Sequence, residues 1–222
     1  TAMNDWRYLG ETEDNRVNNL IRFIRGIEDN STEYEGSPTL RARTVNGKPW
    51  KLSDIVYSTP VSIAKPVEKY NLIYDDQTYW SFYAKYGDNE TTKRETIVYV
   101  GSNGGMLHAF SSGIYDQASK SFAQAAGSSE RIGDELWAYI PRALLPHLKW
   151  LPRTDYTHVP YVDLKPKIID AQIFTPDAAH PYGWGTILIG GMNLGGKKIP
   201  VPGASSTAYY YSSYFAIDIT NP

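Results

Sequence analysis

The chain has 222 residues, 22 basic and 24 acidic side chains, and a formal net charge of −2 at pH 7. Because the basic residues are scattered, it lacks the one-signed stripe that attracts a phosphate backbone, which argues against a nucleic-acid partner. It contains no cysteine, which excludes disulfides, thiolate metal sites and cysteine nucleophiles, and its longest apolar runs are too short to span a bilayer.

The first part of the chain predicts one short α-helix over residues 14–25. Four apolar side chains recur there at the spacing i, i+3, i+4 and i+7: Val17, Leu20, Ile21 and Ile24. Asp14 or Asn15 is available as the N-cap, and Gly26 follows the end of the pattern.

The residues around this helix predict no further regular structure. Residues 28–51 are polar and punctuated by glycine and proline, which indicates a loop or a short irregular excursion that adds nothing to the core. Residues 1–53 are therefore interpreted as an N-terminal helix with an irregular lead-in. The opening "TAMNDWRY" has neither an initiator Met nor a basic-then-apolar leader, so we expect a removed targeting segment or a fragment.

After residue 53 the helical period disappears and short β-strands are predicted. Four stretches rich in β-branched and aromatic residues are separated by turn residues: 54–64, 96–102, 106–112 and 135–141. Pro60 interrupts the first stretch, and because proline lacks an N–H it favours a strand edge or bulge there. The aromatic stretch 79–87 fits either a strand or an aromatic-anchored loop, and residues 142–158 fit a short apolar turn or helix cut by two prolines.

The strand pattern then recurs in the second half of the chain. Three stretches repeat the order of the first three strands: 161–173, 185–196 and 210–220. Three residue pairs correspond, at an offset on the order of 90 to 107 residues: Pro60 with Pro166, Gly101 with Gly190, and Ala109 with Ala216. We call each copy a strand module.

Two such modules, each with a glycine-rich corner between its second and third strands, predict neighbouring blades of a β-propeller. The fold class expected is mainly β: a partial β-propeller of about two four-stranded antiparallel blades, the second incomplete, preceded by one short α-helix. Residues 54–141 form the first blade with long insertion loops, and residues 142–222 form a connector and the incomplete second blade. Two blades cannot close a ring, so either the remainder of the propeller or a strand-donating chain is the expected partner.

The order of motifs resembles one known family. The runs "LSDIVYSTPV", "VYVGSNGGMLHAF", "ELWAYIPRALLPHL", "YVDLKPKIIDA", "TILIGGMNLGGK" and "YFAIDITNP" resemble the C-terminal propeller of the PilY-type type IV pilus tip-associated proteins. The resemblance covers about residues 15 to 222, and the corner motif alone is shared more widely, by quinoprotein-like propellers.

The resemblance implies a bacterial protein exported to the periplasm and cell surface, at the pilus tip. A non-enzymatic role in pilus biogenesis or adhesion is implied, with minor pilins and a host or abiotic surface as partners. The family's calcium loop, a run of alternating aspartates, is expected beyond "DITNP", so no cofactor is expected within this chain. The alternatives are a quinoprotein-type dehydrogenase propeller fragment and a generic envelope scaffold without a pilus role.

The glycines of the two corners are interpreted as structural turn residues. They open no helix and no Lys-Ser/Thr follows them, so they form no phosphate-binding fingerprint. Asn103-Gly104 is instead a hairpin signal, because both residues tolerate positive φ. The predicted turn residues are Gly101, Asn103, Gly104, Gly105, Gly190, Gly191, Gly195 and Gly196.

Exposed aromatic residues in insertion loops are the first candidates for a partner surface, with core packing as the alternative. These candidates are Trp80, Tyr83, Tyr86, Tyr209, Tyr210, Tyr211 and Tyr214.

No catalytic or metal-binding residues are predicted. His108 is interpreted as a packed, hydrogen-bonded histidine, and the other three histidines lack the spacing of a zinc-binding pair. Four aspartates at strand ends are interpreted as solvated or turn-capping acids rather than glycosidase carboxylates: Asp54, Asp163, Asp170 and Asp218.

Overall fold

The structure is a computed structural model and describes residues 6–27, 31–88, 94–124, 129–196, 198–200 and 208–221. Its helices are η2 (Arg7–Leu9), α1 (Glu13–Ile24), α2 (Tyr70–Ile73), α3 (Gln77–Tyr83), the π-helix η3 (Ala84–Asp88), and the 3-10 helices η4 (Arg142–Trp150) and η5 (Pro181–Gly183). Its strands are β1 (Thr44–Val45), β2 (Lys48–Pro49), β3 (Val61–Ile63), β4 (Ile97–Gly101), β5 (Leu107–Ser111), β6 (Ile114–Asp116), β7 (Ser121–Ala123), β8 (Glu135–Tyr139), β9 (Lys167–Gln172), β10 (Trp184–Gly191), β11 (Ile199–Pro200), β12 (Tyr209–Tyr210) and β13 (Tyr214–Asp218).

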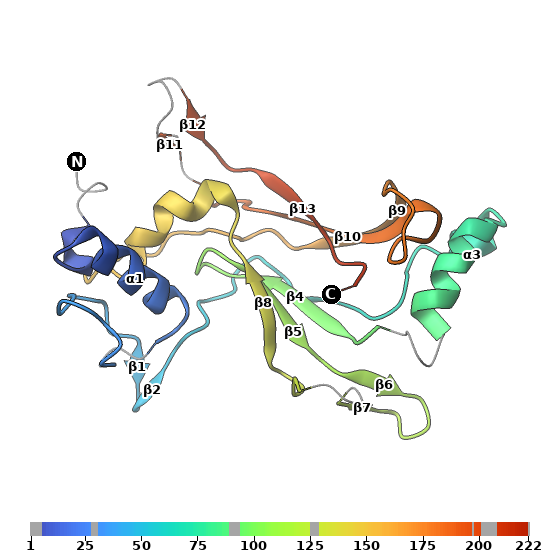
Figure 1. Cartoon of the computed structure of the whole chain (residues 1–222), viewed down its shortest axis with the longest axis horizontal. Helices are drawn as coiled ribbons and strands as arrows, with labels where there is room; N and C mark the ends of the chain where they lie inside the picture. Colours follow the sequence, from blue (N-terminus) through green and yellow to red (C-terminus); the bar gives the residue numbers. More distant parts are fainter. Residues whose placement is uncertain are drawn as a thin grey trace.

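Two antiparallel sheets form the body of the molecule (Figure 1). The first has four strands in the order β3-β4-β5-β8, and the second has three in the order β13-β10-β9. Neither sheet closes into a barrel among the strands described. The mainly β, antiparallel character is thus confirmed, and both sheets contain the strands predicted for the two modules in the predicted order.

The strand registers refine the internal repeat. In the first sheet Tyr99 of β4 lies opposite both Val61 and Ala109, and in the second sheet Ile189 of β10 lies opposite both Lys167 and Ala216.

Strands β3 and β9 each begin directly after a proline, Pro60 or Pro166, so that correspondence agrees with the registers. The expected pairing of Gly101 with Gly190 was wrong by one residue. Gly101 lies opposite Leu107 and Gly191 lies opposite Tyr214, two residues beyond Tyr99 and Ile189 respectively. Gly191 is therefore the counterpart of Gly101.

Helix α1 is present, but its predicted N-cap was wrong. The hydroxyl of Thr12 accepts a hydrogen bond from the N–H of Asn15 at 3.1 Å, so Thr12 is the cap rather than Asp14 or Asn15. Gly26 follows the helix with φ +81°, as expected for a residue past a helix end.

Residues 28–51 contribute more than was predicted. Strands β1 and β2 form a short hairpin, and Tyr34 and Leu40 pack against the main core. That core lies between the two sheets and includes Tyr99, Leu107 and Leu188.

The insertion between β3 and β4 is helical, so the prediction of a strand or loop over residues 79–87 was wrong, whereas the short helix allowed within residues 142–158 is present as η4. The carboxylate of Asp76 caps α3 by accepting hydrogen bonds from the N–H groups of Thr78 and Tyr79. One face of α3 and η3 then buries Tyr79, Phe82 and Tyr86.

This insertion belongs to the first sheet but packs on the second. Trp184 of β10 completes the aromatic cluster of α3, and its indole N–H donates to the hydroxyl of Thr78 at 2.8 Å. Figure 1 shows α3 at the end of the molecule opposite α1, beyond the end of β9. The insertion therefore fastens the two sheets together.

A buried carboxylate completes this junction. Asp170 of β9 accepts hydrogen bonds from the hydroxyl groups of Tyr79 and Thr186, at 2.8 and 2.7 Å. It also accepts from the N–H groups of Val67 and Glu68, at 2.6 and 3.2 Å. Burial, followed by the nearby Asp170 charge, raises the pKa of the Tyr79 hydroxyl.

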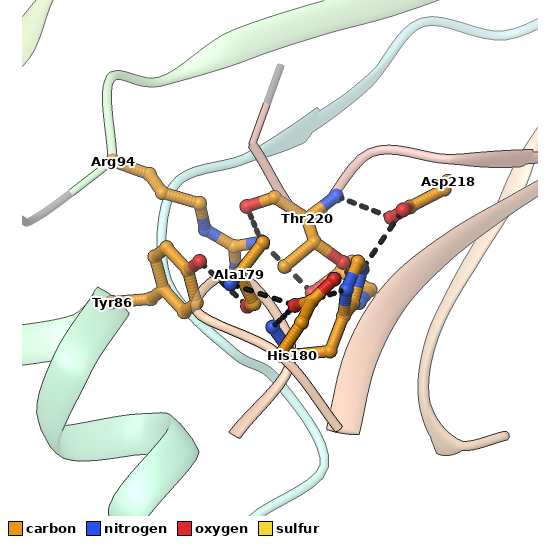
Figure 2. Close-up of polar contacts among 8 residues, drawn as sticks. Tyr86, Arg94, Ala179, His180, Asp218 and Thr220 are labelled. Carbon is orange, nitrogen blue, oxygen red and sulfur yellow. Dashed lines mark hydrogen bonds and ion pairs between the residues drawn. The ribbon is translucent and has the colours of Figure 1, made fainter. Parts of the chain in front are cut away.

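Arg94, just before β4, extends the same network. Its guanidinium donates to the Thr186 hydroxyl at 2.8 Å and to the carbonyl of Thr220 at 3.3 Å, and its Nε donates to the carbonyl of Ala64 at 2.8 Å. Figure 2 shows this guanidinium beside Thr220 and the ring of Tyr86. Asp170 and Asp163 are both buried, so their interpretation as solvated strand ends was wrong.

We expect Asp170→Asn to lower the free energy of unfolding by about 3 kcal/mol, because an amide leaves buried donors without an acceptor. Urea unfolding followed by tryptophan fluorescence measures this loss. Asp218→Asn, at an exposed position on the same sheet, is the matched control and should cost about 1 kcal/mol or less. Equal losses in the two variants would contradict a special role for Asp170.

Candidate functional site

The first corner, residues 101–105, is a tight turn between β4 and β5. The N–H of Gly105 donates to the carbonyl of Ser102 at 3.3 Å, and Gly105 has φ +88°. Asn103 and Gly104 do not have the positive φ that the two-residue hairpin predicted, because the left-handed residue comes one position later.

The same corner holds the start of the second module. The amide oxygen of Asn103 accepts from the N–H of Tyr161 at 3.1 Å, and the carbonyl of Ser102 accepts from the N–H of Val162 at 3.3 Å. The Asn103 amide nitrogen donates to Asp54 at 2.7 Å, which fixes the orientation of the side chain. The corner thus binds the backbone of residues 161–162, which we call the approach segment of the second module.

Gly101 is required by this contact rather than by its φ angle. A Cβ atom at Gly101 would lie 2.2 Å from the carbonyl oxygen of Val162, far inside van der Waals contact. Glycine is needed at this position because the backbone of Val162 lies against its Cα.

The second corner, residues 190–196, follows β10. A Cβ atom at Gly190 would lie 2.4 Å from the ring of Phe215, and one at Gly195 would lie 2.1 Å from the carbonyl oxygen of Tyr161. Gly191 has milder contacts at 3.0 Å, and Gly196 has φ +73°. Glycine is therefore favoured by crowding at Gly190, Gly195 and Gly196, and at Gly196 also by its conformation.

Two of the aromatic candidates on the insertion form a stacked pair, in which Trp80 is exposed and Tyr83 is half-buried and packs against the aromatic cluster of α3. Trp80 of α3 is 47% exposed and stacks on Tyr83 with ring centroids 6.0 Å apart and an interplanar angle of 14°. Tyr86 is only 5% exposed, and its hydroxyl donates to the carbonyl of Ala179 at 2.7 Å. Tyr86 is therefore a packing residue, and its prediction as part of a partner surface was wrong.

The other four candidates gather near the outer strand of the second sheet. Tyr209 and Tyr210 of β12 are half-buried, whereas Tyr211 and Tyr214 are exposed. With Tyr139, Arg142 and neighbouring residues they line a shallow hollow of about 400 Å³. We call these four residues the tyrosine edge.

An apolar hollow that the sequence did not reveal lies between α1 and the first sheet. Its volume is about 730 Å³, and its lining includes Leu20 and Ile24 of α1, Phe110 of β5 and Leu145 of η4. The polar groups at its wall include His108 and Glu135.

Hydrogen bonds link Ser102, His108 and Glu135 in the same order as the serine, histidine and carboxylate of a hydrolase triad. The Nε2 of His108 lies 2.8 Å from the hydroxyl of Ser102 and its Nδ1 lies 2.5 Å from Glu135. However, Ser102 is only 1% exposed, its oxygen also accepts from the N–H of Gly104, and it is not part of the wall of the apolar hollow. These three residues therefore stabilise the turn of the first corner. The prediction of a packed, hydrogen-bonded His108 is confirmed.

A second histidine ties the loop before β10 to β13 (Figure 2). The ring of His180 contacts Asp177 through Nδ1 and Asp218 through Nε2, both at 2.9 Å, and stacks on Phe174. Hydrogen bonds from His180, the backbone N–H above all, lower the pKa of Asp177. In the described ranges no three His, Asp or Glu side chains gather to hold a metal ion, and no helix there is long and apolar enough to cross a membrane.

Comparison with known proteins gives related sequences but no related structure. The chain is 28% identical over 204 residues to a type IV pilus biogenesis factor PilY1 homolog of Xylella fastidiosa, covering 91% of this chain and 13% of that protein. It is 26% identical over 217 residues to the type IV pilus biogenesis factor PilY1 of Pseudomonas aeruginosa strain PAK, covering 96% of this chain and 14% of that protein. No protein-family model matches the chain. No solved structure matches it significantly.

A third relative, PilY1 of another Pseudomonas aeruginosa strain, is 30% identical over 178 residues, which cover 77% of this chain and 11% of that protein. The chain therefore spans only between 11% and 14% of the length of these relatives.

We expect Gly101→Ala to lower the free energy of unfolding by about 2 to 3 kcal/mol, because the new Cβ must displace the Val162 backbone. Chemical denaturation measures the change. Gly47→Ala is the control. Its Cβ meets nothing within 4 Å, so the free energy of unfolding should fall only by the backbone strain of a left-handed alanine, about 1 kcal/mol. A smaller loss at Gly101 than at Gly47 would contradict the docking contact.

The Asp76 cap predicts a pH dependence. Hydrogen bonds from Thr78 and Tyr79 lower the pKa of Asp76. A carboxyl whose pKa is lower in the folded state contributes stability above its unfolded pKa of about 4, and this contribution is lost as pH falls below that value. Asp76→Asn keeps a capping side chain but does not titrate, so the stability difference between wild type and variant should shrink from pH 6 to pH 3. Thermal unfolding across that range measures it, and a constant difference would contradict the role of the charge.

Proposed function

Because the chain belongs to the PilY1-type family of type IV pilus biogenesis factors, we propose that it is a segment of a larger exported pilus protein. In that protein it acts at the pilus tip as a non-enzymatic adhesin and assembly module. The observation that carries this proposal is the match of most of this chain to several pilus biogenesis factors. The adhesive role rests in addition on the two aromatic surfaces.

The architecture proposed for the segment is part of a β-propeller. A four-stranded and a three-stranded antiparallel meander follow one another, with equivalent registers and equivalent glycine corners. Repetition of such sheets around an axis is the arrangement of propellers, in which each blade covers its neighbour. The remainder of the propeller, or a strand-donating chain, is the partner that the second sheet requires at β13.

The proposed work of the segment is contact rather than chemistry. The stacked pair, with Trp80 exposed and Tyr83 half-buried, stands on a helix that is fixed at its cap, and the tyrosine edge borders the outer strand of the second sheet. Rigid aromatic side chains offer contact area at low entropic cost, which suits binding to a minor pilin or to a host or abiotic surface.

The site of action is proposed to be the cell surface, reached through the periplasm. The calcium loop implied by the resemblance stays a prediction about sequence outside this chain, and calcium-dependent control is not assigned to any residue here.

Deletion of the whole gene in the source bacterium should reduce the number of surface pili and abolish twitching motility. Pili are counted by electron microscopy, and twitching zones are measured under agar. Complementation with the full-length gene should restore both properties. Normal pili and normal twitching in the deletion strain would overturn the proposed pilus role.

In the full-length protein, the double variant Trp80→Ala with Tyr83→Ala should lower adhesion several-fold while the pilus number is kept, because it removes the exposed Trp80 ring and the half-buried Tyr83 ring stacked on it. Attachment of cells to a coated surface measures the effect. Tyr115→Ala, an aromatic of similar exposure (44%) on the β6-β7 hairpin, is the matched control. Wild-type adhesion by the double variant would remove the aromatic pair from the proposal.

A further inference from the structure

The two corners occupy the same place in the strand registers, although the left-handed residues differ: Gly105 in the first corner, Asn193 and Gly196 in the second. Alignment of Gly101 with Gly191 places Ser102 with Met192, Asn103 with Asn193, and Gly105 with Gly195. Both turns are closed by the same bond: Gly105 N–H donates to Ser102, and Gly195 N–H donates to the carbonyl of Met192 at 2.6 Å. In both corners the amide nitrogen of the asparagine faces an aspartate, at 2.7 Å from Asn103 to Asp54 and at 3.5 Å from Asn193 to Asp163, although Asn193 has φ +49° and Asn103 has no positive φ.

The first corner is occupied, since it binds the approach segment of the second module. The groups it uses are the Asn103 amide oxygen, the Ser102 carbonyl and the bare Cα of Gly101. In consequence Tyr161 and Val162 are almost completely buried, between the first corner on one side and Gly195 on the other.

The second corner presents the same three groups, but nothing in the described structure occupies them as Tyr161 and Val162 occupy the first. Asn193 is exposed, and among the described residues the three atoms nearest to a Cβ at Gly191 come from its own module: from Leu164, Ser213 and Tyr214.

The approach segment of the first module, Ile55 and Val56, is not covered by a corner in the described structure. Ile55 and Val56 stand five and four residues before Pro60, as Tyr161 and Val162 stand before Pro166. Although they occupy the same place in the repeat, Ile55 is 37% and Val56 is 55% exposed. A corner therefore covers the second approach segment but not the first, and within the described residues no approach segment occupies the same three groups of the second corner.

We propose that the second corner is a docking site for the approach segment of a further strand module. Its backbone donates one N–H to the amide oxygen of Asn193 and the next N–H to the carbonyl of Met192, while its carbonyl passes over Gly191. The inference rests on the module architecture proposed above and not on the pilus role. A normal pilus number in the deletion strain would overturn the pilus role alone, and a failure of the experiment below would overturn the docking site alone.

The probe is a fluorescein-labelled peptide with the sequence of residues 159–169, which carries a natural approach segment. Its affinity for the 222-residue chain is measured by fluorescence anisotropy, and its position by hydrogen exchange. We expect saturable binding that protects amides of residues 191–196. The same peptide, N-methylated at the two donor positions, should not bind, because both hydrogen bonds are removed.

Substitutions in the second corner separate docking from folding. Asn193→Gly should weaken peptide binding about tenfold, because one hydrogen bond to the incoming backbone is lost while glycine tolerates the φ of +49° at this position; Asn193→Ala is compared with it. Gly191→Ala should abolish binding while the thermal unfolding temperature stays close to that of the wild type, since its Cβ contacts are at 3.0 Å or more. Leu194→Ala, at an exposed position on the same turn, is the matched control and should bind as the wild type does.

Two results would overturn the proposal. One is absence of saturable binding by the unmodified peptide. The other is binding that survives both Asn193→Gly and Gly191→Ala, or that protects residues 101–105 instead, which would mean that the peptide displaces the internal segment.

Discussion

The buried carboxylate of Asp170 is the constraint on which the arrangement of the two sheets depends. Four donors converge on it from three parts of the chain: the loop before α2, helix α3 and strand β10. A carboxylate removed from water is tolerated only when its oxygens are satisfied, so the three parts must meet for any of them to be stable. Arg94 adds a positive charge to the same junction and shares Thr186 with Asp170.

This junction explains how contact surfaces can be held rigidly on a chain with short strands. Helix α3 has fewer than ten residues and would not persist alone, but its buried face is fixed on Trp184 and its first turn is capped by Asp76. The outward face, with Trp80 and Tyr83, is thereby fixed in orientation. A surface on such a support loses little conformational entropy when it binds, which suits an adhesive contact.

The sequence was informative where structure is local and less so where it is long-range. Strands β4, β5 and β10 were predictable because β-branched runs end in glycine turns. Helix α3 was missed, although Tyr79, Phe82 and Tyr86 have the spacing i, i+3 and i+7, because aromatic residues also favour strands. The burial of Asp170 had no local signal, since its donors Val67 and Glu68 are more than a hundred residues away. The repeat predicted both corners, but only the strand registers identified Gly191 as the counterpart of Gly101.

The packing of an insertion from the first sheet on the second sheet has a consequence for biosynthesis. A ribosome makes the chain from its N-terminus, so Tyr79, Phe82 and Tyr86 emerge long before Trp184 can cover them. During that interval the first module exposes an aromatic face with no native partner, which is the kind of surface that chaperones bind and that promotes aggregation. The first module is thus complete only when the second has been made, and both are expected to reach their final state in one cooperative step.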